Sequence, residues 1–211
     1  MNSLLTLLST DPKNTLVALL ALIIGISVHE FAHAWTATKL GDETPRLQGR
    51  VTLNPAAHLD PLGSIFFLLT GIGWGRPVIY NPMRLKRRSD ELVIALAGPA
   101  SNLLLALLFN ILATLLFQFG KHFTSTPILI ASDINVLLAA FNCIPIPPLD
   151  GSAIVAYFYP PYRSLFGGRF GVLILLALIF IPIGGGTLLS LLVAPLSAWF
   201  NMVVHLFGIL V

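Results

Sequence analysis

Residues 15–33 read TLVALLALIIGISVHEFAH, an apolar run that ends in two histidines and a glutamate. A helix over residues 14–40 rises about 40 Å at ~1.5 Å per residue, which is enough to cross a ~30 Å hydrocarbon core. Three ionisable side chains within one turn of such a helix are costly in hydrocarbon unless they pair, bind an ion or face water. We therefore predict a membrane-spanning helix that carries a functional site.

The ionisable end of this run has the pattern H-E-x-x-H, from His29 to His33. A spacing of four positions places both imidazoles on one helix face, where they can bind a single zinc ion at ~2.0 to 2.1 Å. Glu30 then lies beside the attacking water as a general base. So short a pattern also arises by chance, and the hydrophobic context is what favours the metal site.

A catalytic zinc site needs a third protein ligand and an open position for water. No glutamate follows Glu91, and Thr36 and Lys39 occupy the places of the glycine and histidine in the metzincin pattern. Asp150 is the best remaining candidate, because prolines in residues 144–148 open the helix before it and can turn its carboxylate inward. Alternatively, Asp150 caps a helix that begins at the next residue.

The composition places the whole chain in a bilayer. Of its 211 residues, 56% are hydrophobic and 10% charged, and the mean hydropathy is +0.87, which excludes an ordinary soluble domain. The single cysteine, Cys143, excludes an intramolecular disulfide. We expect one membrane domain over residues 1–211 with about five crossings, the later ones at residues 90–119, 127–142, 170–183 and 187–210.

Between the first two spans the pattern changes to short pieces broken by proline and glycine. Residues 50–53 and 77–80 predict two short strands that pair as a small β element at the membrane surface. Residues 62–72 would form a helix only about 17 Å long, which predicts a re-entrant helix. The predicted fold is an all-α polytopic membrane protein, with a three-helix catalytic core over about 14–158 and additional helices over about 170–210.

The positive charges predict the orientation. Seven of the twelve Lys and Arg lie between residues 41 and 89, and short loops rich in Lys and Arg remain in the cytoplasm. Arg163 and Arg169 form a second basic cluster, whereas the turn at Lys121 is poor in charge and fits the opposite side. We expect a multi-pass protein of the plasma membrane whose metal site opens to the cytoplasm.

Three motifs on successive spans resemble the site-2 protease family of intramembrane zinc metalloproteases: HEFAH at 29–33, AGPASN at 97–102 and FNCIPIPPLDG at 141–151. The stretch GRVTLNPAAHLDPLG at 49–63 is similar to the compact branch, which has no PDZ or regulatory domain. The resemblance implies a three-helix catalytic core that cleaves transmembrane substrates near their cytoplasmic side. It implies these roles: zinc ligands His29, His33 and Asp150, base Glu30, and substrate contacts Asn142, Pro147 and Pro148.

Three further polar residues are candidates for a supporting role. His58 and Asp60 could orient the metal ligands, but a turn stabilised by side-chain hydrogen bonds explains them nearly as well and is favoured. For Asn102, an interhelical hydrogen bond is favoured over direct contact with substrate.

Two other functions fit parts of the pattern. A membrane metal-binding or transport protein would use the same His and Asp cluster without hydrolysis, and a catalytically silent scaffold would only hold helices. Glu30 favours hydrolysis, because a carrier needs no glutamate that is not a ligand beside its metal. We expect transmembrane proteins as substrates, the lipid bilayer as surroundings and no nucleic acid; a homo-oligomer or an accessory membrane protein stays open.

Overall fold

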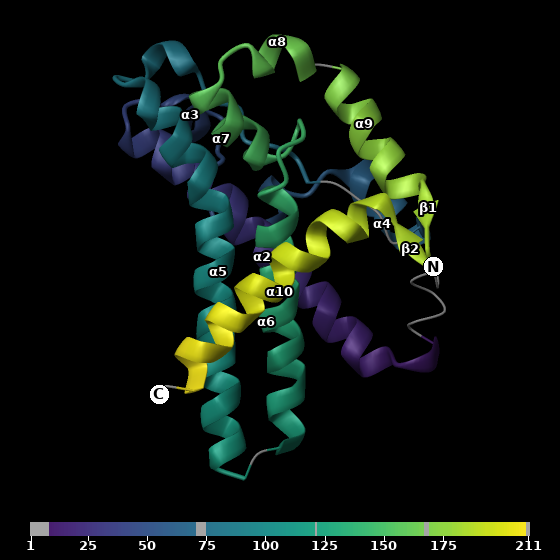
Figure 1. The fold of residues 1–211 in the computed structure, drawn as a ribbon. Coiled ribbons are helices and arrows are strands. Elements are labelled where there is room, and N and C mark those ends of the chain that lie inside the picture. The colour runs from purple at the N-terminus through teal and green to yellow at the C-terminus, as the bar shows by residue number, and fades with distance from the viewer. Residues whose placement is uncertain (1–8, 71–74, 121, 167–168, 210–211) are drawn as a thin grey trace.

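The computed structural model describes residues 9–70, 75–120, 122–166 and 169–209. Its centre is formed by three helices that pack against one another: α2 (Pro12–Lys39), α5 (Arg88–Gln118) and α6 (His122–Asn142) (Figure 1). Helix α2 begins at Pro12. The preceding residue, Asp11, caps the helix, because its side chain accepts a hydrogen bond from the Asn14 backbone N–H. The predicted three-helix core is therefore present in the fold.

Shorter elements surround this core. They are α3 (Thr44–Leu47), η1 (Pro55–Ala57), α4 (Pro61–Thr70), η2 (Pro82–Arg84), α7 (Asp150–Phe158), α8 (Tyr162–Phe166), α9 (Arg169–Phe180), β1 (Pro182–Ile183), β2 (Gly186–Thr187) and α10 (Leu188–Ile209). The two strands pair antiparallel, Pro182 with Thr187 and Ile183 with Gly186. Helix α10 runs obliquely across α5 and α6 (Figure 1), where Val204 packs on Ala106 and Val136.

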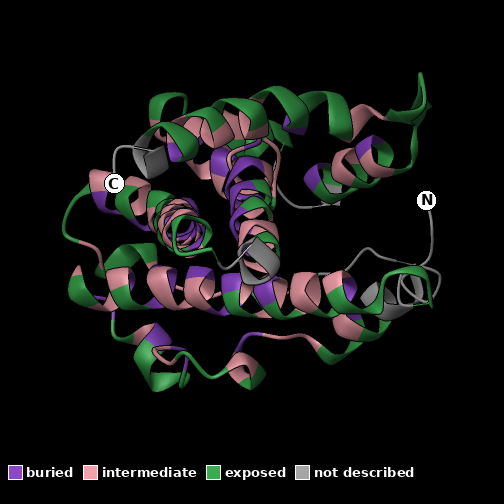
Figure 2. Cartoon of the chain, turned by 90° about the horizontal axis from the view of Figure 1, so that it is seen from below, coloured by how far each residue is buried: buried purple, intermediate pink, exposed green. Residues whose placement is uncertain are grey.

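Small side chains allow the central helices to approach closely. Ala34 and Ala37 on α2, Ala106 on α5 and Ala139 on α6 are all fully buried, as is typical of helices that pack within a membrane. Buried residues gather where the helices face one another, and exposed residues line the outside (Figure 2). The hydrophobic side chains that remain exposed, such as Leu104, suit a lipid environment.

Among the described residues, three helical stretches are long and apolar enough to cross a membrane: Pro12–Lys39, Arg88–Gln118 and Leu188–Leu206. The other two predicted spans contain the shorter apolar stretches Thr126–Asn142 and Phe170–Phe180. The protein is thus an all-α polytopic membrane protein, as its composition predicts.

The prediction of strands at residues 50–53 and 77–80 is wrong. Residues 51 and 52 form a bend, residues 77–80 belong to no helix or strand, and the described residues of this loop pair only through an isolated bridge between Leu59 and Gly75. Pro77 has no backbone N–H, and side chains from elsewhere bond the neighbouring backbone groups, so a ladder cannot form there. The small sheet lies instead between α9 and α10. The predicted helix at 62–72 corresponds to α4, and residues 71 and 72 lie outside the described residues.

Candidate metal centre

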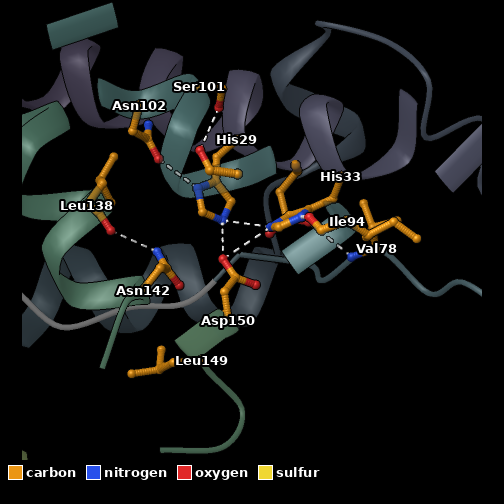
Figure 3. A network of polar contacts seen from close by, with 12 residues as sticks. His29, His33, Val78, Ile94, Ser101, Asn102, Leu138, Asn142, Leu149 and Asp150 are labelled. Atoms are coloured by element: carbon orange, nitrogen blue, oxygen red, sulfur yellow. Dashed lines mark hydrogen bonds and ion pairs between the residues drawn. The ribbon is translucent and has the colours of Figure 1, made fainter. Parts of the chain in front are cut away.

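Two histidines on α2 face each other at the centre of the core. His29 and His33 are 6% and 8% exposed, and their Nε2 atoms lie 3.0 Å apart. The spacing of one helical turn brings both rings to the same face of α2 (Figure 3).

Asp150 completes this cluster from a distant part of the chain. Its Oδ2 atom lies 3.1 Å from Nε2 of His29 and 3.2 Å from Nε2 of His33. Asp150 is the first residue of α7, and the cap residue Leu149 makes no side-chain hydrogen bond. The Asp150 side chain points toward the imidazoles rather than along its own helix (Figure 3), so the geometry favours a ligand over a helix cap.

The outer nitrogens of both imidazoles are held by hydrogen bonds. His33 Nδ1 donates to the Ile94 carbonyl at 2.7 Å, because a carbonyl oxygen can only accept. His29 Nδ1 donates to Oδ1 of Asn102 at 2.6 Å. The orientation of that amide follows from its other partners: Asn102 Nδ2 donates to the Gly25 carbonyl at 3.1 Å and to Asn135 Oδ1 at 3.0 Å.

These tautomers decide what the cluster can bind. With a proton on each Nδ1, both Nε2 atoms present lone pairs toward the Asp150 carboxylate. Oδ2 of Asp150 is buried and receives no hydrogen bond among the described residues. Two nitrogens and one oxygen that surround a tetrahedral zinc ion at ~2 Å lie roughly 3.3 Å apart. The observed 3.0 to 3.2 Å spacings fit zinc closely.

Helix α5 reaches this cluster because residue 98 is a glycine. A Cβ atom there would lie 2.3 Å from His33 Nε2 and 2.5 Å from His29 Nε2. Gly151 has a similar role behind Asp150, where a Cβ atom would lie 2.3 Å from the Cys143 carbonyl oxygen. The backbone of α5 and the turn before α7 therefore form walls of the site.

Glu30 lies beside the ligands without joining them. Its Oε2 atom accepts a hydrogen bond from the Val78 backbone N–H at 3.0 Å and lies 3.9 Å from Nη2 of Arg50. The side chain is 15% exposed and lines the same cavity as His29 and His33. A carboxylate in this position can take a proton from a group that enters the cavity.

The cavity at the metal site has a volume of about 240 Å³ and opens between α2, α5, α7 and residues 77–80. Asn142 and Pro148, predicted substrate contacts, line it. Asn142 Nδ2 donates to the Leu138 carbonyl at 3.0 Å. Pro147 lines an adjoining cavity of about 220 Å³, whose wall is shared with the first at Tyr80.

His58 and Asp60 have no contact with the ligands. His58 is fully buried and its Nε2 atom donates to the Thr52 carbonyl at 2.7 Å. Oδ1 of Asp60 accepts the Gly63 N–H at 2.8 Å, at the start of α4. The structure thus places both in the turns of the loop, and brings only Asn102 of the three supporting candidates to the metal site.

Sequence reasoning missed two residues beside the site, Arg50 and Asn135. Asn135 could have been found, because an amide within an apolar span signals a buried hydrogen bond. Arg50 carries no such local signal, since it is one of several arginines in a polar loop.

Comparison of the sequence with known proteins places this chain among metallopeptidases. Residues 17–128 match the family described as Peptidase family M50. The chain is 37% identical over 184 residues to "Putative zinc metalloprotease YwhC" of Bacillus subtilis, covering 82% of this chain and 84% of that protein. It is 28% identical over 193 residues to "Putative zinc metalloprotease Rip2" of Mycolicibacterium smegmatis, covering 88% and 70%. No solved structure matches the chain significantly.

Proposed function

Because the chain belongs to peptidase family M50 and is a zinc metalloprotease of the membrane, we propose that it cuts transmembrane substrates near their cytoplasmic side. The chain would do so as a single membrane-embedded domain over residues 1–211. The observation that carries this proposal is the meeting of His29, His33 and Asp150 in a buried cavity within the helical core, with Glu30 beside them.

Different residues of the site have different roles in the proposed hydrolysis of a peptide bond. His29, His33 and Asp150 would hold the zinc ion, which supplies Lewis-acid activation of the scissile carbonyl and of the attacking water. The Glu30 carboxylate takes a proton from that water and returns it to the nitrogen that leaves. Asn102 and the Ile94 carbonyl keep both imidazoles in the tautomer that leaves Nε2 free for the metal.

The charge distribution supports a cavity that opens to the cytoplasm. The loop over residues 40–87 connects the C-terminal end of α2 to the N-terminal end of α5, so its basic residues lie at the end of the bundle that carries the site. The C-terminal end of α5 and the N-terminal end of α6 lie at the opposite end of the bundle (Figure 1). By the positive-inside rule, the site end would face the cytoplasm, with the plasma membrane as the bilayer.

A substrate helix must unwind before cleavage, because its carbonyls are bonded within the helix. We propose that the segment over residues 77–80, which belongs to no helix or strand, receives the unwound chain, since Pro77, Val78 and Tyr80 line the cavity. Two side chains anchor this segment from outside: Glu30 binds the Val78 N–H at 3.0 Å, and Asp42 binds the Asn81 N–H at 2.5 Å. Single proline substitutions at Ile79 and Tyr80 should weaken cleavage, and undiminished cleavage by both would exclude this mode of capture.

The experiment that tests the function combines metal analysis with cleavage. Purified wild type, Glu30→Gln and Asp150→Ala are compared on a panel of single-span substrates in liposomes, with Glu43→Gln as the matched control. Glu43 lies outside the site, half exposed beside Arg46. We expect Glu30→Gln to keep zinc and lose cleavage, and Asp150→Ala to lose both. Cleavage by Glu30→Gln at the wild-type rate would overturn the mechanism.

A further inference from the structure

An arginine lies buried behind the proposed general base. Arg50, in the loop after α3, is 5% exposed. Its Nη1 atom donates to the Ala57 carbonyl and its Nη2 atom to the Arg76 carbonyl. The same Nη2 lies 3.9 Å from Oε2 of Glu30. One guanidinium therefore links two loop segments to the carboxylate on α2.

Burial of a guanidinium costs free energy, which favours a functional role for this arrangement. Removing a charged group from water costs several kcal/mol unless its partners compensate, and the Arg50 Nε atom has no hydrogen-bond partner among the described residues. Arginine suits the position because its planar fork can hold two acceptors at once in fixed directions. A lysine has one compact ammonium and cannot reproduce this geometry.

Arg50 and Glu30 hold the same short stretch of backbone from two sides. Arg50 binds the carbonyl of Arg76, and Glu30 binds the N–H of Val78 two residues later. The Arg76 N–H is also taken, by the His58 carbonyl at 2.7 Å. Residues 76–78 thus connect the 50–58 loop to Glu30, and displacement of this stretch would displace the carboxylate that it binds.

We propose that Arg50 is a positioning residue for peptide hydrolysis, which fixes residues 76–78 and thereby holds the Glu30 carboxylate at the metal cavity. The inference rests on the proposed function. Arg50 is not itself a lining residue of the cavity and has no contact with His29, His33 or Asp150 in the described part of the chain. Its one link to the cavity is Glu30, so it acts through Glu30 and the segment. Its loss should slow the chemical step more than it weakens substrate or zinc binding.

The first test compares Arg50→Met, which keeps the length of the side chain without its donors, with Arg50→Lys. Arg46→Met is the matched control, because Arg46 is an exposed arginine of α3, the short helix just before the loop that contains Arg50. Arg50→Met should lower kcat about 10- to 100-fold, the range typical of residues that support a metal site, with KM and zinc content per chain unchanged. Arg50→Lys should restore less than half of the lost kcat. If Arg50→Met loses zinc or unfolds at a lower temperature than wild type, yet keeps the wild-type kcat per zinc-loaded enzyme, then Arg50 only stabilises the fold and the proposal is wrong.

A second test asks whether Arg50 acts through the segment. Val78→Pro removes the N–H that Glu30 accepts, so Arg50→Met should add little to the loss in a Val78→Pro background. Losses that multiply would show independent roles and would overturn the proposal.

Hydrogen–deuterium exchange separates this inference from the proposed function. In zinc-loaded Arg50→Met, the amides of residues 76 and 78–80 should exchange faster than in wild type or in Arg46→Met. If wild type cleaves no substrate of the panel, the proposed function fails while this measurement still reports on the link. Unchanged exchange in Arg50→Met would contradict the inference even if cleavage is observed.

Discussion

Oδ1 of Asn102 on α5 lies 2.6 Å from Nδ1 of His29 on α2, so one helix fixes the imidazole that its neighbour contributes to the candidate metal centre. Asn102 is fully buried and also bonds the Gly25 carbonyl and Asn135. The Asn102 side chain thus joins α2, α5 and α6 at a candidate metal ligand.

Replacement of Asn102 by alanine should weaken zinc binding about 10- to 100-fold, because His29 loses the acceptor that fixes its tautomer and ring orientation. Competition with a chelator measures the affinity. Asn110→Ala is a matched control: Asn110 is on the same helix, is buried, and bonds His205, which is not in the metal cluster. Equal zinc affinity in both variants would show that Asn102 supports only helix packing.

Gly98→Ala should abolish zinc binding and cleavage together. The added methyl group would lie 2.3 Å from His33 Nε2, where no carbon can fit without moving the ligand or α5. Zinc content per purified chain checks this, with Ala100→Val as the control because residue 100 is exposed on the same helix. A Gly98→Ala protein with full zinc content would mean that α5 lies farther from the ligands than described.

Removal of zinc should lower the thermal unfolding midpoint, and its return should restore it, because a ligand that binds only the folded state stabilises that state. Asp150→Ala should show no such rise at zinc concentrations that saturate wild type. Asp60→Ala, which changes a carboxylate in the turn before α4, should keep the zinc-dependent rise. An equal response in all three proteins would place the metal elsewhere.

Asp42 should make stability depend on pH. Burial alone raises the pKa of its carboxyl group, but hydrogen bonds from Thr44 and Asn81 and the charge of Arg84 outweigh that effect and hold the pKa below its usual value. A carboxyl with a lowered pKa in the folded state contributes stability above its unfolded pKa of about 4, and that stability disappears as the pH falls through the folded value.

Asp42→Asn should therefore unfold more easily than wild type at pH 7, by about 1–3 kcal/mol, and the difference should shrink as the pH falls below about 4. Denaturant unfolding at several pH values measures it, and Glu43→Gln, the exposed neighbour, serves as the control. A difference that stays constant with pH would mean that the charge of Asp42 does not matter.

The sequence predicts the core of this protein well because its signals are local. Long apolar runs mark α2 and α5, and a spacing of four residues places His29 and His33 on one face. Asp150 could be chosen because few acids remain in the second half of the chain. The prediction of strands at 50–53 and 77–80 is wrong because the contacts that decide the structure there are not local. Glu30, Asp42 and Arg50 bond the backbone of residues 78, 81 and 76, within and on either side of the second expected strand. These partners are distant in sequence, and local patterns do not show them.

The ligand set is divided between α2 and the start of α7, with more than half of the chain between His33 and Asp150. A ribosome-bound chain that has inserted its first three long helices already carries both histidines and Glu30, yet it lacks the carboxylate that completes the cluster. Biosynthesis therefore completes the candidate ligand set only when the last part of the three-helix core and the start of α7 have emerged.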